Sequence, residues 1–240
     1  MIAMTWAGAQ DQVWQLQGAM VDLDGTMVDT LGDFTQAIAR MLHAMQLPPL
    51  AASAIEHMVG KGTEHLLRSA LAAVLPLSAT STAPLAQQVE ALYPQAHALY
   101  MEHYIAINGA HSKVYDGVAQ GLQALKAAGM RLACVTNKPL AFTTPLLQAK
   151  GLADVFEVVL GGDSLARKKP DPLPLLTACE WMGTLPQHTL MLGDSSNDAQ
   201  AARAAGCPVV LVSYGYNHGQ PIRSVDADGY VDTFTQLRLL

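Results

Sequence analysis

The sequence predicts an α/β protein in which an open parallel sheet is interrupted by an all-helical insert. Two observations lead to this class. From about Tyr115 onward, short apolar runs alternate with stretches of helical periodicity, which is typical of a parallel sheet covered by helices on both faces. A further apolar strand, 18–23, is separated from these runs by a long segment with helical periodicity and almost no strand character.

Local signals place each element in order. The first helix is expected from Phe34 to Met45, where apolar side chains recur at three- and four-residue spacing, and it ends before Pro48 and Pro49. More helices of the insert are predicted at 51–58, 63–75 and 84–107, with a loop from Leu77 to Pro84. In the second half, strands are predicted at 130–136, 155–160, 189–192 and 208–212, and helices at 118–129, 139–150, 172–182 and 196–205.

Composition excludes several classes of protein. Half of the 240 residues are hydrophobic, which allows a sizeable core, and the net charge is −6 with no Lys and Arg cluster that forms a basic stripe. Nucleic acid and anionic membrane are therefore not expected as partners. No segment is long enough to cross a membrane, and Met1 to Gln17 does not resemble a signal peptide, so a cytoplasmic location is expected. The three distant cysteines are expected to be reduced core thiols.

The most informative motif is a pair of carboxylates, Asp22 and Asp24, which is followed by the turn residues Gly25 and Thr26. Residues two apart on a strand share a face, so both acids are expected to project the same way. Like charges this close are costly unless a cation lies between them, and a divalent cation with oxygen ligands is the usual solution. The alternative is a solvated turn in which Asp and Thr cap a helix.

Other reactive side chains follow further predicted strands, at the edge of a parallel sheet where ligands bind. Thr136 and Asn137 follow one strand, Asp194 and Asp198 follow another, and Lys169 precedes the helix near 172. Each suits phosphoryl transfer, which needs a carboxylate nucleophile, donors to the phosphoryl oxygens, a lysine and Mg²⁺. Individually each has a structural alternative, a helix cap or a surface lysine. Their common position at strand ends favours the catalytic interpretation.

These motifs, in this order, resemble those of the haloacid-dehalogenase-like phosphatases over the chain from about Gln17 to Leu240. Three stretches are most similar to the bacterial phosphoglycolate phosphatases: Asp22 to Thr30, Gly162 to Pro170 and Tyr214 to Gly219.

The resemblance implies a Rossmann-like three-layer core with a parallel sheet, formed by 1–29 and 112–240, and an inserted all-helical cap domain, 30–111. The implied activity is Mg²⁺-dependent hydrolysis of 2-phosphoglycolate to glycolate and phosphate through an aspartyl-phosphate. The implied partner is a small phosphorylated metabolite, and both a monomer and a homodimer remain open.

Roles are transferred by position. Asp22 resembles the nucleophile and a Mg²⁺ ligand, and Asp24 resembles the general acid and base, with its backbone carbonyl as a second ligand. Asp194 resembles the third protein ligand. For this chemistry Asp24 must titrate above Asp22, which direct contact of Asp22 with the metal would achieve.

The remaining residues bind or orient. Thr136 and the amide of Asn137 are expected to bind the phosphoryl group, and Lys169 to offset its charge. Asp198 is expected to orient Lys169 or a metal-bound water. Lys168 is expected to be a surface charge.

Substrate choice is less determined. Lys61, in the helical insert, is expected to bind the carboxylate of the substrate, with Arg68 and His65 as alternatives and a solvated lysine as the structural explanation. A Schiff-base role for Lys61, as in phosphonatases, is disfavoured because it needs a desolvated pocket. Other possible activities are a sugar-phosphate or nucleotide phosphatase and, less favoured, a sugar-phosphate mutase or an inactive binding module.

Overall fold

The computed structural model describes residues 1–6, 12–78 and 83–240. Within them, six parallel strands form the central sheet in the order β10-β9-β8-β3-β6-β7. These strands are β3 (Gly18–Val21), β6 (Arg131–Val135), β7 (Val158–Leu160), β8 (Thr189–Gly193), β9 (Val209–Val212) and β10 (Gly229–Val231). The strand that carries the first acidic motif, β3, lies between β6 and β8, so its carboxyl end is at the middle of the sheet edge.

Helices cover both faces of this sheet, which confirms the three-layer prediction. They are α5 (Val118–Ala127), α6 (Leu140–Ala149), α7 (Leu173–Met182) and α8 (Ser196–Ala205). Ala19 and Val21 belong to an apolar cluster with side chains of α5 and α6, whereas Met20 belongs to a second cluster with side chains of α7 and α8. Alternate residues of β3 therefore face opposite layers, as the period of a strand requires.

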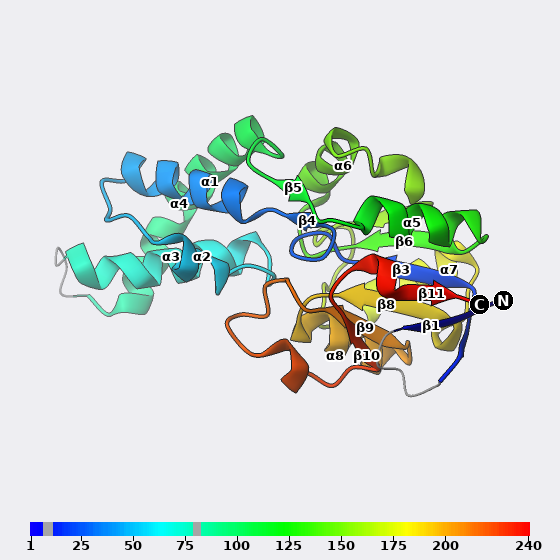
Figure 1. Cartoon of the computed structure of the whole chain (residues 1–240). Coiled ribbons are helices and arrows are strands. Elements are labelled where there is room, and N and C mark those ends of the chain that lie inside the picture. The colour runs from blue at the N-terminus through cyan, green and yellow to red at the C-terminus, as the bar shows by residue number, and fades with distance from the viewer. Residues whose placement is uncertain (7–11, 79–82) are drawn as a thin grey trace.

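The segment between the first strand and the rest of the sheet is helical, as expected, and we call it the helical insert. It contains α1 (Leu31–Ala44), α2 (Ala52–Glu56), α3 (Thr63–Ser78) and α4 (Leu85–Ile107). These helices share an apolar cluster of their own, which includes Ile38, Leu67 and Tyr100. Figure 1 shows them as a separate lobe beyond the carboxyl ends of the strands. A short antiparallel pair, β4 (Val28–Asp29) and β5 (Lys113–Val114), joins the two lobes.

Some boundaries differ from the sequence prediction. Helix α3 continues to Ser78, beyond its expected end at 75 and past Pro76. Part of the loop expected from Leu77 to Pro84 lies outside the described residues, at 79–82. The strand expected at 155–160 is shorter, because Val155 is the last residue of a 3₁₀ turn, Ala153–Val155, and β7 begins only at Val158.

A second, three-stranded sheet was not predicted. It is antiparallel, with the order β11-β1-β2, and consists of β1 (Ile2–Trp6), β2 (Trp14–Leu16) and β11 (Leu237–Leu239). The indole rings of Trp6 and Trp14 stack with centroids 5.5 Å apart. Because Met4, Trp6 and Leu16 belong to the same apolar cluster as β3, this sheet extends the core and pairs the two ends of the chain.

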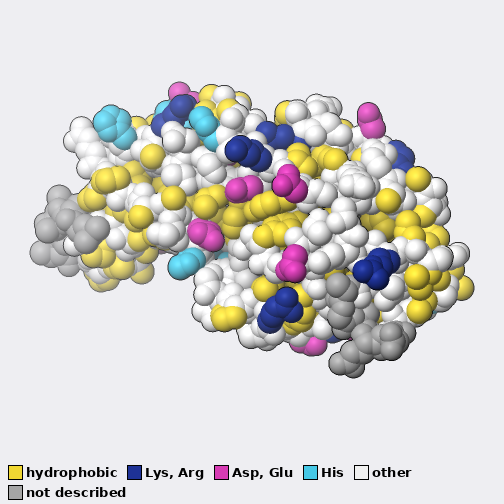
Figure 2. Space-filling view, viewed as in Figure 1, with side chains coloured by type: hydrophobic (Ala, Val, Ile, Leu, Met, Phe, Trp, Pro, Cys, Tyr) yellow, Lys and Arg dark blue, Asp and Glu magenta, His cyan; other side chains and the backbone are white. Residues whose placement is uncertain are grey.

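The surface agrees with the low charge of the chain. On the face shown in Figure 2, Lys and Arg side chains are scattered singly among Asp and Glu. None of the helices in the described part of the chain combines the length and apolar character that a membrane span needs.

Candidate active site

The first acidic motif begins where β3 leaves the sheet. The Asp22 amide still donates to the Leu192 carbonyl of β8, at 2.9 Å, and the Gly25 amide then closes a turn by donating to the Val28 carbonyl. Both Asp22 and Asp24 are buried, with 8% of each residue exposed. Gly25 has a φ of +82°, and a Cβ there would lie 2.2 Å from Asp194 Oδ2. A glycine is therefore required for the turn to approach the second acidic motif.

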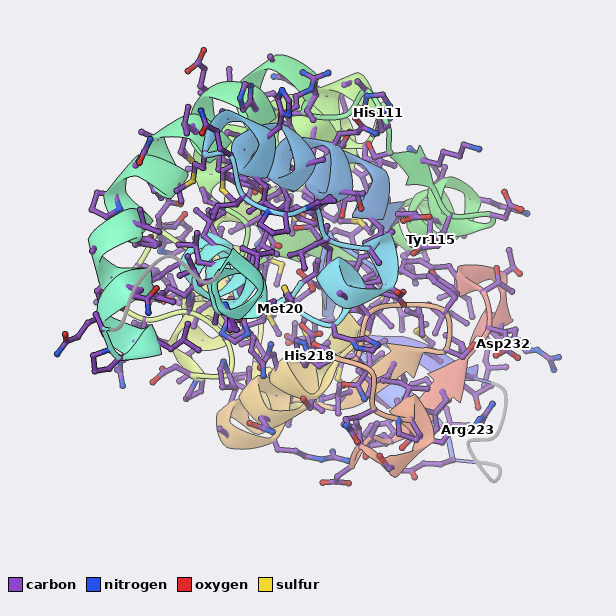
Figure 3. The ribbon with its side chains drawn as sticks, turned by 90° about the vertical axis from the view of Figure 1, so that its left-hand side faces the viewer. Met20, His111, Tyr115, His218, Arg223 and Asp232 are labelled. Atoms are coloured by element: carbon purple, nitrogen blue, oxygen red, sulfur yellow. The ribbon has the colours of Figure 1, made fainter. Side chains whose placement is uncertain are left out.

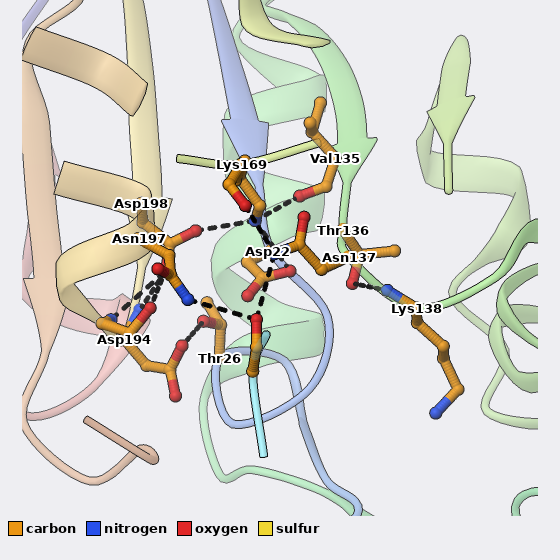
Figure 4. A network of polar contacts seen from close by, with 12 residues as sticks. Asp22, Thr26, Val135, Thr136, Asn137, Lys138, Lys169, Asp194, Asn197 and Asp198 are labelled. Atoms are coloured by element: carbon orange, nitrogen blue, oxygen red, sulfur yellow. Dashed lines mark hydrogen bonds and ion pairs between the residues drawn. The ribbon is translucent and has the colours of Figure 1, made fainter. Parts of the chain in front are cut away.

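Lys169 lies between two carboxylates. Its Nζ is 3.0 Å from Asp22 Oδ1 and 2.7 Å from Asp198 Oδ1, and it also donates to the Val135 carbonyl at 2.7 Å (Figure 4). Burial alone would lower the pKa of Lys169, but the charges of Asp198 and Asp22 outweigh it and raise the pKa. Lys169 is therefore a fixed cation against the side chain of Asp22.

Asp198 is committed to protein contacts through both oxygens. Its Oδ1 accepts from Lys169, and its Oδ2 accepts from the Ser195 hydroxyl at 2.8 Å and the Ser195 amide at 3.2 Å. The two residues form a capping box at the start of α8. The structure thus places Asp198 next to Lys169, the position from which sequence analysis expected it to orient this lysine.

A cation would fit between Asp22 and Asp194. Oxygens of these two residues and of Asp198 all lie within 4.8 Å of one another. Burial is the main reason that the pKa of Asp22 rises to about 6 and that of Asp194 well above its usual range, and repulsion from Asp198 raises both further. Asp22 Oδ1 is buried and, apart from its ion pair with Lys169 Nζ, meets no hydrogen-bond donor among the described residues. Three buried carboxylates whose oxygens converge in this way are a ligand set that suits a divalent cation.

The Asp24 side chain points to a different environment from that of Asp22. Its Oδ1 accepts from the Thr30 hydroxyl at 2.8 Å and from Lys138 Nζ at 3.0 Å. Its Oδ2 accepts from no donor within the described ranges. In the protein alone, burial raises the pKa of Asp22, the carboxylate that has to be ionised to act as a nucleophile.

Thr136 and Asn137 lie beside these acids, as predicted. Thr136 follows β6, and its hydroxyl accepts from the Lys138 amide at 3.2 Å. The Asn137 side-chain amide donates to the carbonyls of Lys169, at 2.9 Å, and Gly60, at 3.0 Å. The backbone amide of Asn137 donates to no acceptor in the described part of the chain, which leaves it available to a ligand.

The three residues of the helical insert that were predicted to bind the substrate carboxylate do not line the cavity over Asp22 and Asp24. Lys61 is exposed, although its neighbours Gly60 and Gly62 line the cavity over Asp22 and Asp24. Arg68 is bound by Glu64 and Glu90 at the surface of the insert. The nearest hydrogen-bonding partner of the His65 ring is Ser69 on the same helix, at 3.5 Å.

No role was predicted for Lys138, which follows Thr136 and Asn137 at the end of β6. Its ammonium is buried, contacts Asp24, and also donates to the Tyr104 hydroxyl of α4. The adjacent Thr136 and Asn137 were the signal that could have led to it. Its contact with Tyr104 could not be found in the same way, because that contact depends on how the helical insert packs against the core.

The loop that carries Tyr216 links the acidic cluster to the insert. The Tyr216 amide donates to Asp194 Oδ2 at 2.6 Å. Its hydroxyl donates to Asp29 and accepts from the amides of Thr30 and Leu31, at the start of α1. This loop, for which no role was predicted, therefore connects Asp194 to the junction between the lobes.

A second contact between the helical insert and the core lies at Gly60, above the site. The Gly60 carbonyl accepts from the side-chain amides of Asn137, at 3.0 Å, and Asn197, at 3.2 Å. The Asn197 amide also lies 3.3 Å from His218 Nε2. Figure 3 shows His218 beneath the helices of the insert, at the junction of the two lobes. The core and the insert are therefore in contact directly above the carboxylates.

The site combines an aspartate pair at the end of β3, a buried lysine and a second group of acids after β8. On a parallel α/β core, this combination is the one that sequence analysis associated with phosphoryl-transfer hydrolases. Residues 19–212 match the family of haloacid dehalogenase-like hydrolases, and the chain belongs to this family.

Individual relatives are similar over nearly their whole length. The chain is 42% identical to a phosphoglycolate phosphatase of Thiobacillus denitrificans, over 94% of this chain and 95% of that protein. It is 44% identical to a phosphoglycolate phosphatase of Nitrosospira multiformis, over 90% and 91%. The crystal structure of a predicted phosphoglycolate phosphatase from Haemophilus somnus has a TM-score of 0.86 at 34% identity, and covers 92% of this chain and 95% of that one.

Proposed function

We propose that this hydrolase is a Mg²⁺-dependent phosphatase that converts 2-phosphoglycolate to glycolate and phosphate. The observation that carries the proposal is the position of Lys169, 3.0 Å from Asp22 and 2.7 Å from Asp198, beside the buried cluster of Asp22, Asp194 and Asp198. The similarity to relatives named phosphoglycolate phosphatase supports the substrate.

The reaction proceeds in two steps. Asp22 attacks phosphorus in line, and an Asp22–phosphorus bond forms as the bond to the leaving oxygen breaks. Asp24 gives its proton to that oxygen, which leaves as the hydroxyl of glycolate. Asp24 then takes a proton from water, and the resulting hydroxide attacks phosphorus and releases phosphate from Asp22.

Other groups hold the phosphoryl oxygens. The Thr136 hydroxyl and the Asn137 amide donate to them, and Lys169 offsets the negative charge beside Asp22. Mg²⁺ would be held by carboxylates of Asp22 and Asp194 and the backbone carbonyl of Asp24, and would supply charge neutralisation at the phosphoryl group. Asp198 keeps Lys169 in place. The helical insert, 30–111, acts as a cap over the site in the core, 1–29 and 112–240.

The test is phosphate release from 2-phosphoglycolate, compared as kcat/KM with hexose phosphates and nucleotides. Release is expected to need Mg²⁺, to stop with EDTA, and to fall at least about 10³-fold in Asp22→Asn, because the nucleophile is lost. If kcat/KM is higher for a hexose phosphate or a nucleotide than for 2-phosphoglycolate, that compound would be the substrate instead. Isomerisation of a sugar phosphate without net release of phosphate would indicate a mutase.

A further inference from the structure

Lys138 is a buried cation that the proposed mechanism does not use. Its side chain is 2% exposed, and its Nζ lies 3.0 Å from Asp24 Oδ1. It also donates a hydrogen bond to the Tyr104 hydroxyl. Burying an ammonium is costly even when it is paired, so a lysine in this place is not accounted for by packing alone.

Both lobes build the surroundings of this cation. Lys138 itself follows β6 in the core. The rings of Phe34, from α1, and Tyr104, from α4, each lie with their centroid 4.7 Å from its Nζ. Aromatic faces at this distance attract a cation and fix its direction. The ammonium is thus held in one position only when the helical insert is closed on the core.

Lys138 also lines the cavity above the reactive acids. The cavity contains Asp22, Asp24 and Thr136 on its floor, and Lys138 is the only cationic side chain among the described residues that line it. Much of the rest of its wall is apolar, formed by Phe34, Val59, Leu66, Tyr100, Tyr104 and Phe142. An apolar pocket with one fixed charge selects a small ligand with one matching charge.

We propose that Lys138 binds the carboxylate of the substrate and so determines the preference for an anionic tail. The inference rests on the proposed function, in which Asp24 protonates the leaving oxygen. In 2-phosphoglycolate only one methylene group separates that oxygen from the carboxylate, so a substrate whose leaving oxygen meets Asp24 carries its carboxylate to the neighbourhood of Lys138.

The hydrogen-bonding capacity of the ammonium agrees with this role. An ammonium has three donors. Asp24 and Tyr104 accept two of them, and the described residues provide no third acceptor. One N–H therefore remains for a carboxylate oxygen. Lys61, which sequence analysis expected to bind this carboxylate, is exposed and does not line the cavity.

The experiment compares two substrates that differ only in the tail. Ethyl phosphate carries a methyl group where 2-phosphoglycolate carries the carboxylate. The quantity measured is the selectivity ratio, kcat/KM for 2-phosphoglycolate divided by kcat/KM for ethyl phosphate. Lys138→Met keeps an apolar chain of similar length in the aromatic surroundings, and we expect it to lower the selectivity ratio on the order of 100-fold, the effect of losing a charged hydrogen bond. Lys61→Met is the matched control, and its ratio is expected to stay within about 3-fold of wild type.

The outcomes separate the alternatives. If Lys138 only positions Asp24, Lys138→Met lowers both values of kcat/KM in parallel and leaves the ratio unchanged, which overturns the proposal. A ratio that collapses in Lys61→Met and not in Lys138→Met overturns it as well. A wild-type ratio near one, with rapid turnover of another phosphate ester, would instead refute 2-phosphoglycolate as the substrate, and the two failures are therefore distinguishable.

A second variant tests the proposal if Lys138→Met does not fold. Thermal unfolding establishes whether Lys138→Met is folded. If it is not, Tyr104→Phe decides the question, because it removes the hydroxyl that holds Lys138 and keeps the ring. Its selectivity ratio is expected to fall about 5-fold, and an unchanged ratio there would contradict the proposal.

Discussion

A carboxylate oxygen of Asp198 lies 2.7 Å from the ammonium of Lys169, and neither side chain is more than 2% exposed. The pair orients the lysine that faces Asp22. Since Asp198 also accepts from Ser195 at the start of α8, one carboxylate connects the active-site cation to a helix terminus. Removal of its charge is therefore expected to affect stability and catalysis together.

We expect Asp198→Asn to reduce the free energy of unfolding by about 3 kcal/mol, because it leaves Lys169 buried with Asp22 as its one remaining carboxylate. Relief of the repulsion between Asp198 and the carboxylates of Asp22 and Asp194 offsets part of this loss. Urea unfolding provides the measurement.

Asp226→Asn is a matched control for that variant. Asp226 pairs with Arg203, and Arg203 keeps a second carboxylate, Asp228, just as Lys169 keeps Asp22. The difference is that the side chain of Asp226 is 80% exposed. Its loss is expected to cost less than about 0.5 kcal/mol. Equal effects of the two substitutions would contradict a special role for the buried pair.

Magnesium binding is expected to stabilise the protein, because a cation between Asp22 and Asp194 relieves the repulsion between these two buried carboxylates. A ligand at about 100 times its Kd adds about 2.7 kcal/mol to the free energy of unfolding. The thermal midpoint should therefore rise with MgCl₂ at constant ionic strength in the wild type and in Asp226→Asn, and should not rise in Asp194→Asn. A rise of the same size in all three proteins would place the cation elsewhere.

Much of the central sheet could be predicted from the sequence because buried parallel strands are short continuous apolar runs, as in Val209–Val212. β10 was missed because Gly229–Val231 is three residues long and starts with a glycine. The N-terminal sheet was missed for another reason. It pairs Met4 with Leu239, and local periodicity carries no information about partners at opposite ends of a chain.

In the candidate site, too, features that follow from local sequence pattern could be predicted, whereas those that depend on tertiary contacts could not. Asp22, Thr136 and Asp194 follow strands, so the rule that ligands bind at the carboxyl edge predicted their proximity. Lys138 stands beside two of the predicted residues, but its importance comes from Tyr104 in the helical insert. How the insert packs on the core depends on tertiary contacts, and the sequence pattern within each lobe does not encode it.

Closure of the insert is expected to depend on Asn197, whose side-chain amide donates to the Gly60 carbonyl at 3.2 Å. Asn197→Ala removes one of the two side-chain donors to this carbonyl, and a net loss of about 1 kcal/mol is expected to favour the open state about 5-fold. Hydrogen exchange at residues 59–62 should accelerate accordingly. Gln200→Ala, an exposed amide on the same helix, is the control, and equal acceleration in both would show that the contact does not hold the lobes together.

The close approach of Gly25 to Asp194 is expected to be essential for the metal site. In Gly25→Ala the new Cβ would lie 2.2 Å from Asp194 Oδ2, and φ is +82°. Gly129→Ala separates the two effects, because Gly129 has a φ of +86° and no atom within 4 Å of the added Cβ. The backbone cost, about 1–2 kcal/mol, is common to both variants. Only Gly25→Ala displaces a carboxylate, so it alone should lose the stabilisation by Mg²⁺ in addition to unfolding more easily than Gly129→Ala. If the two variants respond equally to Mg²⁺, the turn does not position Asp194 for the cation.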